Sequence, residues 1–153
     1  MFKTVQLTKE GYHKFHLELE ELKNQKRPKA IDTLHKARSM GDLSENSAYH
    51  SAREELALVE GRILEIEEIL KLSIVVENNN HTDKVSLGSI ITVESNGVKN
   101  QYKIVGEFEA DPINKKLSSN SPLGAGFIGK KVGDIIEIKI PSGTIVYKIL
   151  KIS

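Results

Sequence analysis

A heptad pattern in residues 49–70 is the feature of this sequence that most constrains its fold. Apolar or small side chains recur at steps that alternate between three and four residues: Tyr49, Ala52, Leu56, Val59, Ile63, Ile66 and Leu70. This spacing forms one continuous stripe on an α-helix and is typical of coiled coils. The segment is therefore predicted to be a long helix that packs against another helix.

A similar seam comes earlier in the chain, but it is interrupted. It begins with Tyr12, Phe15, Leu19 and Leu22, falters over residues 24–29, and resumes with Ala30, Leu34 and Ala37. A slip of this kind is a stutter, and Pro28 within it removes a backbone donor and favours a kink. Thr8 is predicted to cap the start of this helix, and Gly41 to end it.

Two seams of similar length joined by a short turn predict an antiparallel helical hairpin. An arm of about 30 residues would extend roughly 45 Å. We expect the hairpin to occupy residues 1–75, with its tip at residues 41–46. Because a lone two-helix coil buries little surface, the rest of the chain is expected to anchor its base.

Residues 76–153 are predicted to form a second domain of different character. Residues 74–76 read as a short strand that leaves the helix, and residues 78–81 have the chemistry of a turn or linker. Four β-rich runs follow, at residues 89–94, 101–105, 135–140 and 144–152. Asn96-Gly97 and Pro141-Ser142-Gly143 mark hairpin turns.

A short helix is predicted between the second and third of these runs. Ser121 is suited to the N-cap, Pro122 to the first helical position, and Gly129 to the stop. The fold class is therefore α+β: an amino-terminal coiled-coil hairpin followed by a small antiparallel sheet with one short helix.

Composition narrows the classes of function. The 153 residues contain no cysteine, which excludes disulfides and thiolate chemistry. The net charge of +1 gives no global attraction to nucleic acid, and the absence of tryptophan argues against a stacking platform. The sequence shows neither a signal peptide nor an apolar run of membrane-spanning length. We expect a cytoplasmic protein without a membrane partner.

Two carboxylates, Asp42 and Glu45, lie in the predicted turn between the helices. An acid followed three residues later by Glu is a capping-box pattern, and acids at a helix start also favour the helix dipole. Alternatively, the pair ligates a divalent cation, since Mg²⁺ prefers one or two carboxylates and takes its other ligands from water or a partner. From the residues themselves, both interpretations stay open.

Several motifs, found in the same order along nearly the whole chain, resemble the bacterial transcript-cleavage factors of the GreA/GreB family. They are Leu7 to Tyr12, Leu19 to Lys23, Arg27-Pro28, Ala37-Arg38, Gly41 to Asn46, Tyr49-His50, Glu60 to Ile63, Asn120 to Gly124 and Gly129 to Asp134. The resemblance implies a coiled-coil hairpin and an FKBP-like carboxy-terminal domain. It also implies an accessory factor rather than an enzyme.

The same resemblance implies a mechanism. The carboxy-terminal domain binds bacterial RNA polymerase, and the hairpin enters the secondary channel. There Asp42 and Glu45 stabilise a Mg²⁺ ion shared with the polymerase, and the polymerase cleaves its backtracked nascent RNA near the 3′ end. No cofactor is then bound tightly by the factor alone, and we expect a monomer. The family usually has an acid just before the tip tyrosine, where this chain has Ala48.

A basic cluster, Lys23, Lys26 and Arg27, recurs at three- and four-residue steps on the first arm. By resemblance it contacts the extruded RNA or the channel wall; the alternative is an ordinary solvated face.

Arg38, Arg53 and Tyr49 flank the predicted tip. The two arginines are candidates for phosphate contacts, which carry no sequence information. Tyr49 either packs in the seam or reaches the active centre with its hydroxyl.

Other functions are weaker readings of the same residues. His13 and His16 lack a third zinc ligand at a sensible spacing. An independent peptidyl-prolyl isomerase would need a pocket lined by aromatic side chains, of which the second half has few. A channel-binding inhibitor of transcription would keep the architecture and reverse the effect.

Overall fold

The protein is described here from a computed structural model, which describes residues 3–41, 45–77 and 83–153. It contains two compact units: residues 12–72 form one, and residues 1–11 together with 73–153 form the other. The domain boundary after residue 75 stays a prediction, since the first residues of the chain group with its second half. Within the described ranges, no helix is long and apolar enough to cross a bilayer.

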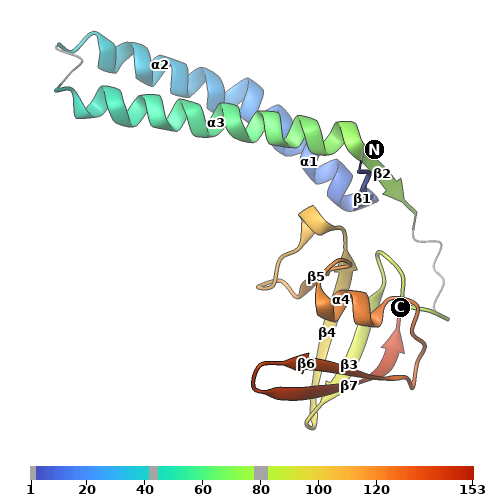
Figure 1. Ribbon diagram of the computed structural model, residues 1–153. Helices are drawn as coiled ribbons and strands as arrows, with labels where there is room; N and C mark the ends of the chain where they lie inside the picture. Colours follow the sequence, from blue (N-terminus) through green and yellow to red (C-terminus); the bar gives the residue numbers. More distant parts are fainter. Residues whose placement is uncertain (1–2, 42–44, 78–82) are drawn as a thin grey trace. The chain divides into compact units, whose positions relative to one another are not determined.

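The first unit is a helical hairpin, as predicted (Figure 1). One arm consists of α1 (Lys9–Glu21), η1 (Leu22–Lys26) and α2 (Arg27–Arg38), and the other is α3 (Ser47–Leu72). The side chains buried between the arms are Phe15, Leu22, Ala30, Ala37, Ala52, Ile63, Ile66 and Ile69. All but Ile69 belong to the predicted seams, where Leu70 was expected in its place.

The interruption in the first seam is a single π-helical turn, η1. The backbone N–H of Arg27 donates to the carbonyl of Leu22, five residues back rather than four. In a regular α-helix the ring of Pro28 would clash with the carbonyl of Asn24. The extra residue accommodated by the wide turn lets the stripe continue from Leu22 to Ala30 on the same side.

Ion pairs join the arms away from the tip. Arg62 on α3 makes a bidentate contact with Glu18, through Nε at 2.7 Å and Nη2 at 3.0 Å. The guanidinium also donates to Glu65 at 2.9 Å. Hydrogen bonding to Glu18 is the main reason that the pKa of Arg62 rises above its ordinary value. A bidentate pair between a guanidinium and a carboxylate fixes the relative orientation of the two side chains and also adds electrostatic attraction.

The second unit contains a five-stranded sheet in the order β5-β4-β3-β7-β6. Its strands are β3 (Ile90–Ser95), β4 (Val98–Val105), β5 (Lys116–Ser118), β6 (Ile135–Ile140) and β7 (Gly143–Ile152). The predicted antiparallel pairs are present, but β5 runs parallel to β4, so the sheet is mixed. The predicted turn at Asn96-Gly97 has positive φ at both residues, as a tight hairpin turn requires.

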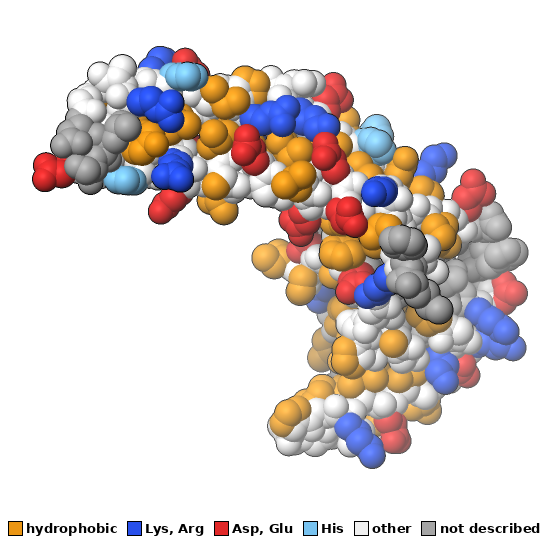
Figure 2. Space-filling model, turned by 45° about the horizontal axis from the view of Figure 1, so that its top comes forward, with side chains coloured by type: hydrophobic (Ala, Val, Ile, Leu, Met, Phe, Trp, Pro, Cys, Tyr) orange, Lys and Arg blue, Asp and Glu red, His pale blue; other side chains and the backbone are white. Residues whose placement is uncertain are grey.

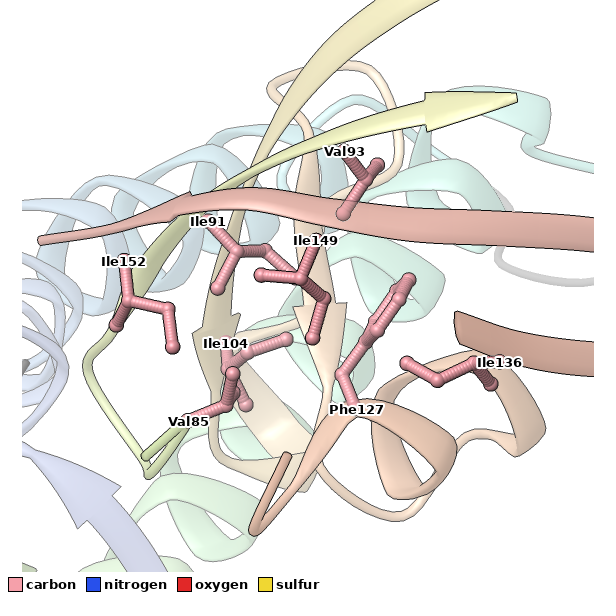
Figure 3. Packing of buried hydrophobic residues seen from close by; sticks show 8 residues of the cluster. All are labelled: Val85, Ile91, Val93, Ile104, Phe127, Ile136, Ile149 and Ile152. Carbon is pink, nitrogen blue, oxygen red and sulfur yellow. The ribbon is translucent and has the colours of Figure 1, made fainter. Parts of the chain in front are cut away.

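The short helix α4 (Pro122–Phe127) begins as predicted. The hydroxyl of Ser121 accepts a hydrogen bond from the N–H of Gly124 at 3.0 Å. The core of the unit consists of Val85, Ile91, Val93, Ile104, Phe127, Ile136, Ile149 and Ile152 (Figure 3). Phe127 reaches from α4 into this cluster and meets the ring of Tyr147 edge to face, with 5.7 Å between centroids.

A two-stranded parallel sheet contains one strand that the sequence predicts and one that it does not. It pairs β2 (Ser73–Val76), which was expected, with β1 (Val5–Thr8), which was not. In the register, Val5 lies opposite Ser73 and Thr8 opposite Val76. The strand β1 therefore brings the start of the chain back to the end of α3.

Glu109, in the 3₁₀-helix η2 (Glu107–Glu109), binds the junction of β1 and α1. Its carboxylate accepts from the N–H of Thr8 at 2.9 Å, from the hydroxyl of Thr8, and from the N–H of Gly106 at 3.0 Å. The hydroxyl of Thr8 accepts from the N–H of Gly11 at 3.1 Å, which confirms Thr8 as the helix cap. A Cβ at position 11 would lie 1.8 Å from Oε1 of Glu109, so this close approach requires glycine.

Candidate functional site

Small side chains are buried where the two helices approach the tip of the hairpin. α2 ends at Arg38 with Ser39 as its C-cap, so the stop predicted at Gly41 is one residue late. Ala37 and Ala52 are buried between the arms. Asp42 lies outside the described residues, whereas Glu45 is described and exposed.

Asn46 caps α3, a role that the sequence reading missed. Its Oδ1 accepts a hydrogen bond from the N–H of Tyr49, the third helical residue, at 3.1 Å. The capping-box interpretation of Asp42 and Glu45 is therefore wrong, because the helix begins after Asn46. Asn is a preferred cap residue, and that signal was available in the sequence. The structure leaves the Glu45 carboxylate outside the helix, free of a capping role.

The other end of the Asn46 side chain contacts the opposite arm. Its Nδ2 donates to the carbonyl oxygen of Ala37 at 2.7 Å. One amide thus connects the last turn of α2 to the first turn of α3.

Two further predicted residues lie together at this end. The guanidinium of Arg38 lies 5.8 Å from the ring centroid of Tyr49, in the range of a cation–π contact. Tyr49 is half-buried and also meets His50 edge to face, with 5.5 Å between centroids. Arg53 is exposed one turn further along α3. Arg38, the last residue of α2, and Arg53 on α3 thus place positive charge on both helices at this end of the hairpin.

The three residues of the predicted basic cluster differ in their contacts and in their exposure to solvent. Lys23 pairs with Glu67 on the opposite arm at 2.6 Å, and Arg27 is half-buried. Lys26 is exposed, and within the part of the chain that the structure describes it makes no ion pair. Cationic side chains nevertheless gather along the helical unit in the space-filling view (Figure 2).

In the ranges that the structure describes, no group of three histidine, aspartate or glutamate side chains lies close enough to hold an ion. His16 packs edge to face on Tyr12, with 4.6 Å between ring centroids. Glu45 offers one exposed carboxylate, which suits a hard cation whose remaining ligands come from elsewhere.

Two family models together match most of the chain. One, described as "Transcription elongation factor, N-terminal", matches residues 5–75. The other, described as "Transcription elongation factor, GreA/GreB, C-term", matches residues 79–153.

Curated relatives match over nearly their whole length. Transcription elongation factor GreA of Clostridium botulinum strain Langeland is 49% identical over 150 residues, which cover 96% of this chain and 94% of the relative. GreA of Lactococcus lactis subsp. cremoris is 45% identical, with 99% of each chain covered. Among solved structures, the GreA factor homolog 1 (Gfh1) of Thermus thermophilus is 27% identical, with 99% of each chain covered and a TM-score of 0.47.

Proposed function

Because the chain belongs to the GreA/GreB family of transcription elongation factors, we propose that its hairpin tip stimulates cleavage of backtracked nascent RNA by RNA polymerase. The chain is an accessory factor that acts on RNA polymerase during elongation, not an enzyme. Cleavage creates a new RNA 3′ end, from which an arrested complex resumes synthesis. We propose that the factor acts in the bacterial cytoplasm, as one copy on each elongation complex.

The observation that carries the proposal is the exposed Glu45 directly before the long helix α3. α3 has 26 residues, which corresponds to about 39 Å of helix. Since Asn46 caps that helix, the carboxylate of Glu45 is available to a partner. An arm of this length with small residues at its end suits insertion into a channel of a larger protein.

We propose that Asp42 and Glu45 together hold a Mg²⁺ ion whose other ligands belong to the polymerase. Oxygen donors fit this hard cation. When bound, the ion activates water and stabilises charge on the phosphate that is cleaved. The chain's own contribution is to present the two carboxylates; close to them in the sequence, Arg38 lies over the ring of Tyr49.

Purified components test the function directly. We expect stalled, backtracked elongation complexes to release short 3′ RNA fragments much faster with the protein than without it. The protein alone should release none from the same RNA. Hydrolysis without polymerase would contradict the accessory role. Slower elongation without any cleavage would instead identify a channel-binding inhibitor.

The basic cluster predicts a dependence on the length of the extruded RNA. Reversing the charge of Lys23, Lys26 and Arg27 should slow the cleavage of long extruded segments more than that of dinucleotides, because only long segments reach back along the arm.

The structure singles out Lys26 for the sharpest form of this test, since it is exposed and unpaired among described residues. Lys26→Glu should weaken cleavage of long segments by about fivefold, as expected for roughly 1 kcal/mol of phosphate interaction. Lys71→Glu, exposed at the far end of α3, is the matched control. Equal losses on long and short RNA would argue against an RNA path along the arm.

A further inference from the structure

We propose that Asn46 is a positioning residue: its side-chain amide clamps the two arms together and so determines where the neighbouring Glu45 carboxylate is presented. This inference rests on the proposed function for its consequence, but the clamp itself is a property of the isolated protein.

The clamp uses both ends of one amide. Oδ1 accepts from the N–H of Tyr49 at 3.1 Å, and Nδ2 donates to the carbonyl of Ala37 at 2.7 Å. The first N–H groups and the last carbonyls of a helix lack partners one turn further along. The amide therefore supplies a missing acceptor to α3 and an additional donor to α2, whose Ala37 carbonyl also accepts from the N–H of Met40 at 3.2 Å.

Few other side chains could replace it. Aspartate keeps the acceptor for the helix cap and has no donor for the opposite arm. Alanine lacks both. The structure therefore separates two roles of a single residue, capping and clamping, that different substitutions can remove.

Among the described residues, few other polar contacts connect the arms near the tip. Arg62 lies 16 residues along α3 from Asn46, which is about 24 Å of helix. Within the described ranges, no ion pair joins the arms between Arg62 and the tip. The described contacts between the arms in this stretch include the packing of seam side chains, among them the buried Ala30, Ala37 and Ala52, and the placement of Arg38 over Tyr49.

The clamp matters for chemistry because it adjoins the functional carboxylate. Glu45 and Asn46 are consecutive, so their Cα atoms are about 3.8 Å apart. A misplacement of a reacting group by about 1 Å can cost on the order of a hundredfold in rate. Loss of the donor to Ala37 is therefore expected to reduce cleavage without weakening the attachment to polymerase.

The test compares Asn46→Asp with Asn46→Ala. Asp is as good a cap as Asn and favours the helix dipole, so the helical content of Asn46→Asp should match the parent. Asn46→Ala loses the cap as well. Ser47→Asp adds the same charge one residue away and keeps the amide, which makes it the matched control.

Distances between the arms provide a readout independent of activity. The chain has no cysteine, so spin labels at Ser39→Cys and Ser51→Cys, both exposed positions, report one distance across the tip. We expect a narrow distribution in the parent and in Ser47→Asp, and a clearly broader one in both Asn46 variants. In backtracked complexes, Asn46→Asp should lower the cleavage rate at saturation by about a hundredfold. Its half-saturating concentration should stay within about twofold of the parent, as expected when positioning rather than binding is lost.

An unchanged distance distribution in Asn46→Asp would overturn the clamp. A broader distribution with parental cleavage would overturn its positioning role. If instead the Asp42→Ala variant cleaves like the parent while Asn46→Asp broadens the distribution, the tip chemistry is wrong and the clamp stands.

Discussion

Replacing Asp42 by alanine is expected to abolish stimulated RNA cleavage, with a loss of about a hundredfold or more, while binding to RNA polymerase persists. The expected size is that of removing one preorganised electrostatic contact to a developing charge. The substitution removes one of two carboxylates proposed to hold a shared Mg²⁺ ion, and the sheet-bearing unit is untouched. Asp42→Asn keeps the shape of the side chain and should lose nearly as much, because an amide oxygen is a weaker ligand for Mg²⁺.

The measurement is the rate of fragment release from backtracked complexes at saturating factor, with affinity obtained by competition against the parent. Asp32→Ala, at an exposed site on the same arm, removes a carboxylate away from the tip and serves as the control. Raising the Mg²⁺ concentration should restore part of the activity of Asp42→Ala, because the site has lost a ligand. Parental cleavage by Asp42→Ala would show that the proposed chemistry is wrong.

The second large effect concerns stability. Phe127→Ala should lower the free energy of unfolding of the sheet-bearing unit by about 3–5 kcal/mol, the usual cost of deleting a buried aromatic ring. Phe127 is 0% exposed and is surrounded by the isoleucines and valines of the core. Deleting the ring would leave a cavity and would also remove its edge-to-face contact with Tyr147.

Denaturation should be followed by a probe specific to that unit, since two units need not unfold together. Methyl resonances of Ile104 and Ile149, both fully buried, serve in urea titrations. Phe108→Ala is the matched control, because that ring is 45% exposed and its removal should cost less than about 1 kcal/mol. Equal losses of unfolding free energy for both variants would contradict the assignment of Phe127 to the core.

The sequence predicts the helical hairpin well because a heptad stripe of apolar side chains is buried most simply by packing against a second helix. It locates the defect near Pro28, but it does not reveal a π-turn, since a slipped stripe can also be absorbed gradually over several turns. The short helix α4 is predictable from local chemistry alone: Ser121 and Pro122 suffice.

Other elements depend on contacts that no local pattern shows. β1 has four residues, and it pairs with β2, which is distant in the sequence: Val5 lies opposite Ser73. β5 has only three half-buried residues, one of them apolar, and it joins β4 in a parallel sense.

At the tip, several consecutive residues are suited to capping a helix. The choice of Asn46 follows from the reach of its amide to Ala37, which is a tertiary contact. The roles of Asp42 and Glu45 in metal binding stay predictions, because the remaining ligands belong to another molecule.

The π-turn η1 determines which side of α2 faces α3. One residue corresponds to about 100° of rotation around a helix, so deleting a residue from η1 would turn every later side chain of α2 by that amount relative to α1. Ala37 would leave the seam, and the carbonyl that Asn46 now reaches would lie on another side of the arm. The contact between Asn46 and the Ala37 carbonyl thus depends on an irregularity near Pro28, about 15 Å of helix away.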